Sequence, residues 1–77
     1  MADATLDARG LRCPLPVLRA RKAMQQLAPG QVLLLIATDP GTRADVEAFC
    51  AATGHELLDS QAAGGEFTYQ IRKASGR

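Results

Sequence analysis

The segment that most constrains the fold of this chain is a run of five apolar residues, VLLLI, at positions 32–36. Turn-forming residues bound the run on both sides, with PG at residues 29–30 and DPG at residues 39–41. An apolar, β-prone run between turn signals is typical of a buried strand. We therefore predict a central strand over residues 31–38.

Helical and extended patterns alternate along the rest of the chain. They predict a short strand over residues 5–8, a helix over 14–27, a second helix from 42 to about 53, a strand over 55–59 and a final strand after a turn at 64–65. The final strand alternates apolar and polar residues cleanly from residue 67 to 72. Thr42 and Asp45 have the spacing of a capping box, and Gly54 is a natural C-terminal cap for the second helix.

This order of elements predicts an α/β fold. Helices between strands imply crossover connections, and two successive strands at the end imply an antiparallel hairpin. Two helices cannot cover both faces of four strands, so we expect both on one face. The prediction is a βαβαββ two-layer sandwich with a mixed four-stranded sheet. A chain of 77 residues has room for a single domain, which we place over residues 1–77.

Composition excludes several classes of protein. The net charge is only +1, from nine Lys and Arg against eight Asp and Glu, whereas nonspecific nucleic-acid binding needs an excess of positive charge. No apolar run approaches the roughly 20 residues of a membrane span, and we see no secretory leader. We therefore expect a cytoplasmic protein. Two cysteines and one histidine make a poor zinc site, so we expect neither a metal nor a cofactor.

The segment CPLP, at residues 13–16, is the most informative for function. Proline is tolerated in the first helical turn and fixes the backbone there, which places Cys13 at or next to the N-cap. The free N–H of Leu15 can then point toward the sulfur. The positive end of the helix dipole, with Arg9 and Arg12 nearby, favours a thiolate. We therefore predict an exposed, nucleophilic thiol with a lowered pKa at Cys13.

Other candidate residues leave alternatives open. His55, the only histidine, follows the second helix and is expected to be solvated rather than catalytic. Leu15 and Leu18 fall on the polar side of the first helix, either as incidental exposed leucines or as an apolar docking patch. Cys50 falls on the inward side of the second helix, either as a small buried hydrophobe or as a second reactive thiol.

A small domain with one activated thiol indicates a carrier that receives a group on sulfur from one protein and passes it to another. The chain lacks an obvious base, oxyanion device or cofactor motif, which argues against a self-sufficient protease or acyltransferase. A regulatory or RNA-binding module is the alternative, since arginines stand at positions 9, 12, 19 and 21, but only 4% of the residues are aromatic and could stack on bases. A thiol redox protein would need a resolving partner near Cys13.

The segment LDARGLRCPLP, at residues 6–16, resembles the signature of the TusA/SirA sulfur carriers, L-D-x-x-G-x-x-C-P-x-P. Further matches are Arg21-Lys22, Pro29-Gly30, Asp39-Pro40, Phe49-Cys50 and the closing Tyr69-x-Ile71-Arg72-Lys73. The resemblance implies the same βαβαββ sandwich. It also implies that Cys13 carries sulfane sulfur as a persulfide, in a sulfurtransferase-like carrier rather than a self-sufficient enzyme.

The resemblance also implies partners that bind transiently. The sulfur donor would be a cysteine desulfurase or a rhodanese-type sulfurtransferase, and the acceptor a DsrE-like relay protein or a downstream pathway. Such pathways include tRNA 2-thiouridine formation, molybdenum cofactor synthesis and sulfur oxidation. Leu15 replaces an acidic residue of the best-known tRNA-thiolation member, which makes the surface near the thiol more apolar. We predict that seven residues form the helix start or contact partners. They are Arg12, Pro14, Leu15, Pro16, Leu18, Arg21 and Asp39.

Overall fold

The apolar run at residues 32–36 lies in β2, an inner strand of a four-stranded sheet. The computed structural model describes residues 2–74. Its elements, in chain order, are β1 (Ala4–Ala8), α1 (Leu15–Gln25), β2 (Val32–Ala37), α2 (Thr42–Thr53), β3 (Glu56–Ala63) and β4 (Glu66–Arg72). The predicted βαβαββ order is confirmed.

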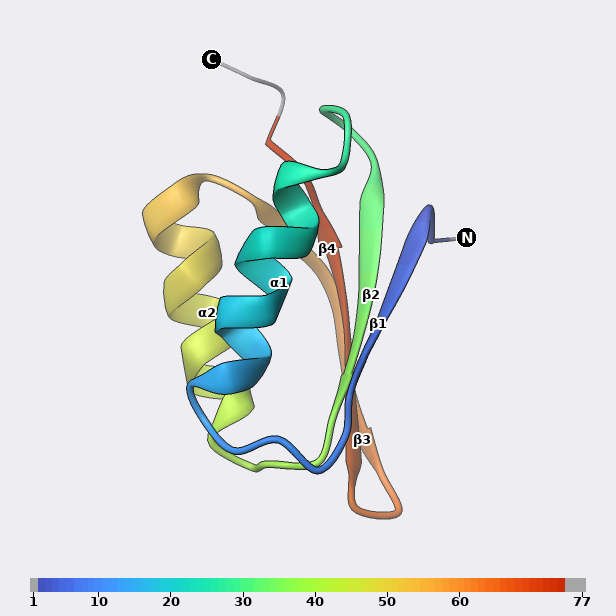
Figure 1. Cartoon of the computed structure of the whole chain (residues 1–77), viewed down its shortest axis with the longest axis vertical. Coiled ribbons are helices and arrows are strands. Elements are labelled where there is room, and N and C mark those ends of the chain that lie inside the picture. The colour runs from blue at the N-terminus through green and yellow to red at the C-terminus, as the bar shows by residue number, and fades with distance from the viewer. Residues whose placement is uncertain (1, 75–77) are drawn as a thin grey trace.

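The sheet is mixed, with the strand order β1-β2-β4-β3. β1 pairs in parallel with β2, whereas β4 pairs antiparallel with both β2 and β3. Both helices lie against one face of the sheet and leave the other face uncovered (Figure 1). The molecule is therefore the predicted two-layer sandwich.

The core lies between the helices and the sheet, and the alternation of each strand selects the residues that enter it. On β2, the side chains of Leu33 and Leu35 are buried, whereas Leu34 between them is half-buried on the open face. Burying a side chain of this kind stabilises the fold by roughly 1.5–3 kcal/mol. The helical residues of the core are Ala20 and Met24 of α1 and Val46, Phe49 and Cys50 of α2.

Helix α1 is shorter than the predicted span of residues 14–27. Pro14 is its N-cap rather than its first residue. At the other end the chain tightens, because the N–H groups of Gln26 and Leu27 donate to carbonyls three residues back. Ala28, the residue after the predicted helix span, is exposed beyond this tighter turn.

Strand β3 is longer than the predicted span of residues 55–59, because its pairing with β4 continues to the turn at residues 64–65. The distal part of β3 is exposed, so no hydrophobic pattern marks it in the sequence. A register shift between Leu57 and Asp59 interrupts the alternation, and Leu58 at this point is exposed.

Parallel pairing of β1 and β2 brings two connecting loops to the end of the sheet where both strands have their carboxyl ends. The loop of residues 9–14 follows β1 and the loop of residues 38–41 follows β2, and they run side by side into the starts of α1 and α2 (Figure 1). The N–H of Gly10 donates to the side chain of Thr38 at 2.9 Å between the loops. Residues far apart in the sequence therefore meet at this end of the sheet.

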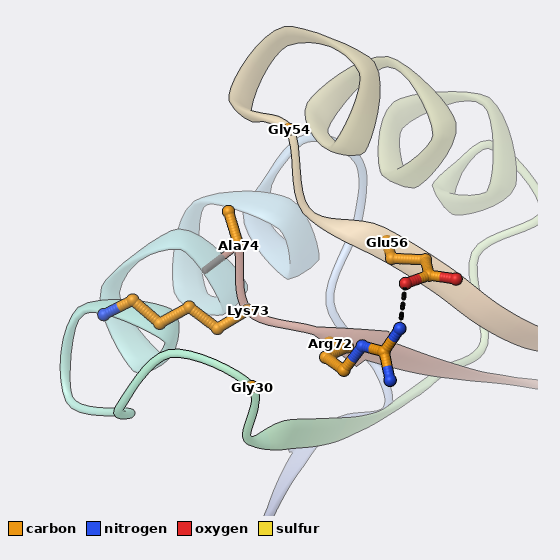
Figure 2. A pocket seen from close by; sticks show the side chains of 6 residues that line it. All are labelled: Gly30, Gly54, Glu56, Arg72, Lys73 and Ala74. Carbon is orange, nitrogen blue, oxygen red and sulfur yellow. Dashed lines mark hydrogen bonds and ion pairs between the residues drawn. The ribbon is translucent and has the colours of Figure 1, made fainter. Parts of the chain in front are cut away.

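A hollow at the opposite end of the sheet is lined in part by Arg72 and Lys73. Both cationic side chains interact with other residues of the same chain. Figure 2 shows the guanidinium of Arg72 directed at the carboxylate of Glu56, with which it forms an ion pair. The Lys73 side chain extends away from this pair (Figure 2), and its Nζ donates to the Leu27 carbonyl at 2.5 Å. This end of the molecule is therefore tied together by its own charged groups.

Helix α2 begins without the predicted capping box. Gly41 is its N-cap, and no side chain caps the helix start. The side chain of Thr42 is fully buried instead, and its Oγ1 has no hydrogen-bond partner within residues 2–74. Gly54 does end the helix in the left-handed conformation with φ 82°, as predicted.

Replacing Thr42 with the isosteric valine is expected to be neutral or to stabilise the fold by about 1 kcal/mol. The reason is that a buried hydroxyl without a partner costs roughly 1–3 kcal/mol. Urea unfolding followed by circular dichroism measures the difference. A loss of about 1 kcal/mol, which is the usual cost of removing a threonine cap, would contradict the structure and support the capping box.

Candidate functional site

Cys13 ends the loop that connects β1 to α1. Pro14 follows it as the N-cap, so the predicted position of Cys13 next to the N-cap is confirmed. The peptide bond between Cys13 and Pro14 is cis. The thiol of Cys13 is free and exposed, and the chain therefore presents an accessible sulfur where the two loops meet.

The N–H of Leu15, which was predicted to face the sulfur, has a backbone partner instead. The N–H of Leu15 donates to the carbonyl of Arg12 at 2.8 Å, which closes a turn across Cys13 and Pro14. The N–H of Leu18 donates to the Pro14 carbonyl at 3.1 Å. The amide that was expected to face the sulfur is thus used by the backbone.

The sulfur lies against the first turn of α2 instead. The Cys13 thiol donates a hydrogen bond to the carboxylate of Asp45. A Cβ atom placed on Gly41, the N-cap of α2, would lie 3.9 Å from Sγ, so the start of this helix runs close beside the thiol. Cys13 is therefore held between the starts of both helices.

Asp39 ties the two loops together at the thiol. Its Oδ2 accepts the N–H of Cys13 at 2.5 Å, and its Oδ1 accepts the N–H of Gly41 at 3.0 Å. These two backbone donors, that of Cys13 first, hold the pKa of Asp39 below its ordinary value, and the charge of Arg12 adds to the effect. Asp39 is therefore an ionised clamp that orients the backbone on both sides of the site.

The pKa of the Cys13 thiol is raised rather than lowered. The largest cause is the hydrogen bond to Asp45, followed by desolvation and by the negative charges of Asp45 and Asp39. Arg9, which was predicted to favour the thiolate, forms an ion pair with Asp7 at 2.9 Å instead. The prediction of a lowered pKa is therefore wrong, because the charged groups that act on the sulfur are the carboxylates of Asp45 and Asp39.

Two shallow grooves flank the thiol. One lies between α1 and α2, has a volume of about 310 Å³ and is largely apolar. The other lies between the two loops and has a volume of about 340 Å³. The groove between the helices is lined by Pro14, Val17, Leu18, Arg21, Asp45, Ala48, Phe49 and Ala52, and the groove between the loops by Gly10, Leu11, Arg12, Thr38, Asp39 and Pro40.

Most of the predicted docking residues reach these two grooves. Pro14, Leu18 and Arg21 line the groove between the helices, and Arg12 and Asp39 line the groove between the loops. Leu15 and Leu18 are 44% and 52% exposed. Pro16 is buried, so it stiffens the helix start but cannot contact a partner directly.

Neither Cys50 nor His55 belongs to this site. Cys50 is buried in the core, and burial raises the pKa of its thiol. His55 lies beyond the far end of α2, where its ring packs 5.3 Å from that of Phe49 and its Nδ1 accepts the N–H of Ala74 at 2.9 Å. Desolvation, and then the charge of Lys73, lower its pKa. His55 therefore cannot serve Cys13 as a base.

Asp45 is the residue of the site that the sequence pattern did not single out. Its spacing from Thr42 favoured a cap on α2, but its side chain meets Cys13, which lies 32 positions earlier. The available signal was the predicted fold, because loops that follow adjacent parallel strands must lie together. An acidic residue in the first turn of α2 could then have been placed beside the thiol.

The fold and the site define a small α/β protein that presents one exposed thiol beside a carboxylate. Within residues 2–74, no group of three or more His, Cys, Asp or Glu side chains could hold a metal ion. Over the same described part of the chain, no helix has the length and hydropathy needed to cross a membrane.

Known proteins share this fold and sequence. A family model described as sulfurtransferase TusA matches residues 4–73. The sulfur carrier protein TusA of Allochromatium vinosum is 51% identical over 72 residues, which cover 94% of this chain and 95% of that protein. Its counterpart in Pseudomonas entomophila is 55% identical over 71 residues, which cover 92% of this chain and 89% of that protein. The crystal structure of a SirA-like protein from Desulfitobacterium hafniense superposes with a TM-score of 0.81 at 26% identity, covering 92% and 97% of the two chains. The chain belongs to the TusA family.

The raised pKa of Cys13 predicts that the thiol ionises at a higher pH in the folded chain than in the unfolded chain. A Cys50→Ala variant leaves Cys13 as the single thiol, and thiolate absorbance against pH, with and without concentrated urea, measures both midpoints. Between the two midpoints the folded chain should hold less thiolate than the unfolded chain. A lower midpoint in the folded chain would contradict the role of the carboxylates.

Proposed function

We propose that this protein is a sulfur carrier that accepts sulfane sulfur as a persulfide on Cys13 and relays it to a cysteine of an acceptor protein. Membership of the TusA family supports sulfur-carrier function over the regulatory or RNA-binding alternative. The observation that carries the choice of residue is the exposed, free thiol of Cys13 at the meeting point of the two loops, since Cys50 is buried.

The transfer follows the chemistry of thiol–disulfide exchange. The Cys13 sulfur attacks the outer sulfur of a donor persulfide, the sulfur–sulfur bond of the donor breaks, and the donor leaves as a thiol. An acceptor cysteine then attacks the outer sulfur of the Cys13 persulfide in the same way. Each step exchanges one sulfur–sulfur bond for another, so neither needs an oxidant or a reductant.

The partners that suit this chemistry are cysteine proteins on both sides of the carrier. A cysteine desulfurase or a rhodanese-type sulfurtransferase is the proposed donor, and a DsrE-like protein is the proposed acceptor. The delivered sulfur would serve tRNA thiolation, molybdenum cofactor synthesis or sulfur oxidation in the cytoplasm. Small, shallow contact surfaces suit the transient complexes that a relay requires.

The grooves beside Cys13 are the proposed docking surfaces. Leu18 is 52% exposed and lines the apolar groove between α1 and α2, where Arg21 adds a positive charge. A partner that inserts an apolar side chain there would bring its own cysteine next to Cys13. An exposed leucine at such a place contributes to binding when a partner covers it.

Replacing Cys13 with serine should abolish loading without unfolding the chain, because the side chain is exposed and the hydroxyl cannot form a persulfide. Intact-mass spectrometry after incubation with a cysteine desulfurase and L-cysteine detects the gain of one sulfur atom, which reduction removes. Cys50→Ser should still load. Normal loading of the Cys13→Ser variant, or failure of a folded Cys50→Ser variant, would contradict the proposal.

Replacing Leu18 with glutamate should raise the desulfurase concentration that half-saturates loading by about tenfold, the scale of an interface contact worth ~1.4 kcal/mol. The maximal loading rate should be unchanged, because the substitution alters the groove and leaves both Cys13 and Asp45 in place. Leu58→Glu is the matched control, since Leu58 is 42% exposed on β3 and does not line the groove. Equal effects of the two substitutions would argue against docking in this groove.

A further inference from the structure

The hydrogen bond between Cys13 and Asp45 presents a chemical problem for a sulfur carrier. The thiolate is the nucleophile in sulfur exchange, yet the carboxylate beside Cys13 favours the protonated thiol. The carrier at rest therefore holds the proton on Cys13, and sulfur transfer requires that this proton be removed. A group that can receive it has to contact the sulfur or lie within one water molecule of it.

Asp45 is placed to receive this proton. It accepts the hydrogen bond from the Cys13 thiol, and within residues 2–74 its carboxylate forms no ion pair. Asp39 is close but differently used, since its two oxygens accept the backbone N–H groups of Cys13 and Gly41. Protonating Asp39 would weaken the clamp between the loops, whereas the Asp45 carboxylate accepts no backbone N–H group within residues 2–74.

We propose that Asp45 is a catalytic proton acceptor and donor for sulfur transfer at Cys13. This inference rests on the proposed function and adds a second residue to it. Asp45 takes the thiol proton as the Cys13 sulfur bonds to the outer sulfur of the donor persulfide, and it returns a proton to the donor sulfur that leaves.

The proposed step balances in atoms and electrons. The sulfur–hydrogen bond of Cys13 and the sulfur–sulfur bond of the donor break, and a new sulfur–sulfur bond forms on Cys13. The proton moves from Cys13 through Asp45 to the departing donor sulfur, which ends as a thiol. Asp45 finishes as a carboxylate, and no external oxidant or reductant takes part.

This role separates two kinds of reactivity. Small electrophiles in solution react with the thiolate, which Asp45 disfavours, so the free carrier should react with them slowly. A bound persulfide reacts by the coupled route, which Asp45 accelerates. Removing the carboxylate should therefore change the two rates in opposite directions, whereas a merely structural residue would affect both rates alike.

Asp45→Asn tests the proposal, with Glu47→Gln as the control. Glu47 lies on the same helix and pairs with Arg43 at 3.3 Å, so this control removes a carboxylate of α2 that does not contact the sulfur. Two rates are measured at pH 7: alkylation by iodoacetamide, and single-turnover loading from a desulfurase that has been pre-charged with L-cysteine. The loading rate is measured over a range of desulfurase concentrations to separate binding from chemistry.

For Asp45→Asn we expect alkylation several times faster than for the unaltered chain. We expect the maximal loading rate to fall about a hundredfold, as removal of a general acid–base typically causes, with the half-saturating concentration little changed. The loading rates of the variant and the unaltered chain should converge at high pH, where the thiol ionises without help. Glu47→Gln should leave both rates unchanged.

Faster loading together with faster alkylation would show that Asp45 only restrains the thiol, and would overturn the proposal. Unchanged maximal loading, or a loss that appears only in the half-saturating concentration, would also overturn it. Failure of the unaltered chain to load is a different result, since it contradicts the proposed function of Cys13 and with it the transfer role of Asp45. Circular dichroism confirms that each variant is folded before the rates are compared.

Discussion

Parallel pairing of β1 with β2 is the constraint on which the site depends. The register sets Ala8 opposite Ala37, the last residues of the two strands, so both loops leave the sheet at the same level. A slip of two residues would displace one loop by roughly 7 Å along the strands. That displacement exceeds the reach of a hydrogen bond, so both contacts of Cys13, with Asp39 and with Asp45, require this register.

The element order was predictable because its signals are local. Turn residues separate the segments, and the apolar run of β2 and the alternation of β4 identify the strands that meet at the centre of the sheet. The distal part of β3 was not predictable in this way, since it is held by backbone pairing with β4 while its side chains stay exposed. A hydrophobic pattern in the sequence indicates which side chains are buried. A strand at the edge of a sheet can form with few buried side chains, so it leaves little pattern.

The site was predictable only in part, for a related reason. The Cys-Pro-Leu-Pro motif is contiguous, so it identified Cys13 and its place before α1. The electrostatics of the thiol depend on Asp45, which approaches from another helix and whose only local pattern, the spacing from Thr42, indicated a helix cap. A helix dipole contributes roughly 0.3–1 kcal/mol to a nearby anion. A carboxylate in direct contact with the sulfur favours the thiol more strongly, because hydrogen bonds to charged groups are about twice as strong as neutral ones.

A relay protein has to expose its sulfur to partners and still withhold it from other reagents. Burial would protect the thiol but would also exclude the partner, whereas a carboxylate beside an exposed thiol restrains it without hiding it. Asp45 also lines the apolar groove between the helices, so a partner seated in this groove would remove water from the carboxylate. Docking in this groove would therefore place a partner against the carboxylate that restrains Cys13. The docking surface and the restraint on the thiol share this residue, so recognition of a partner and control of the thiol meet at Asp45.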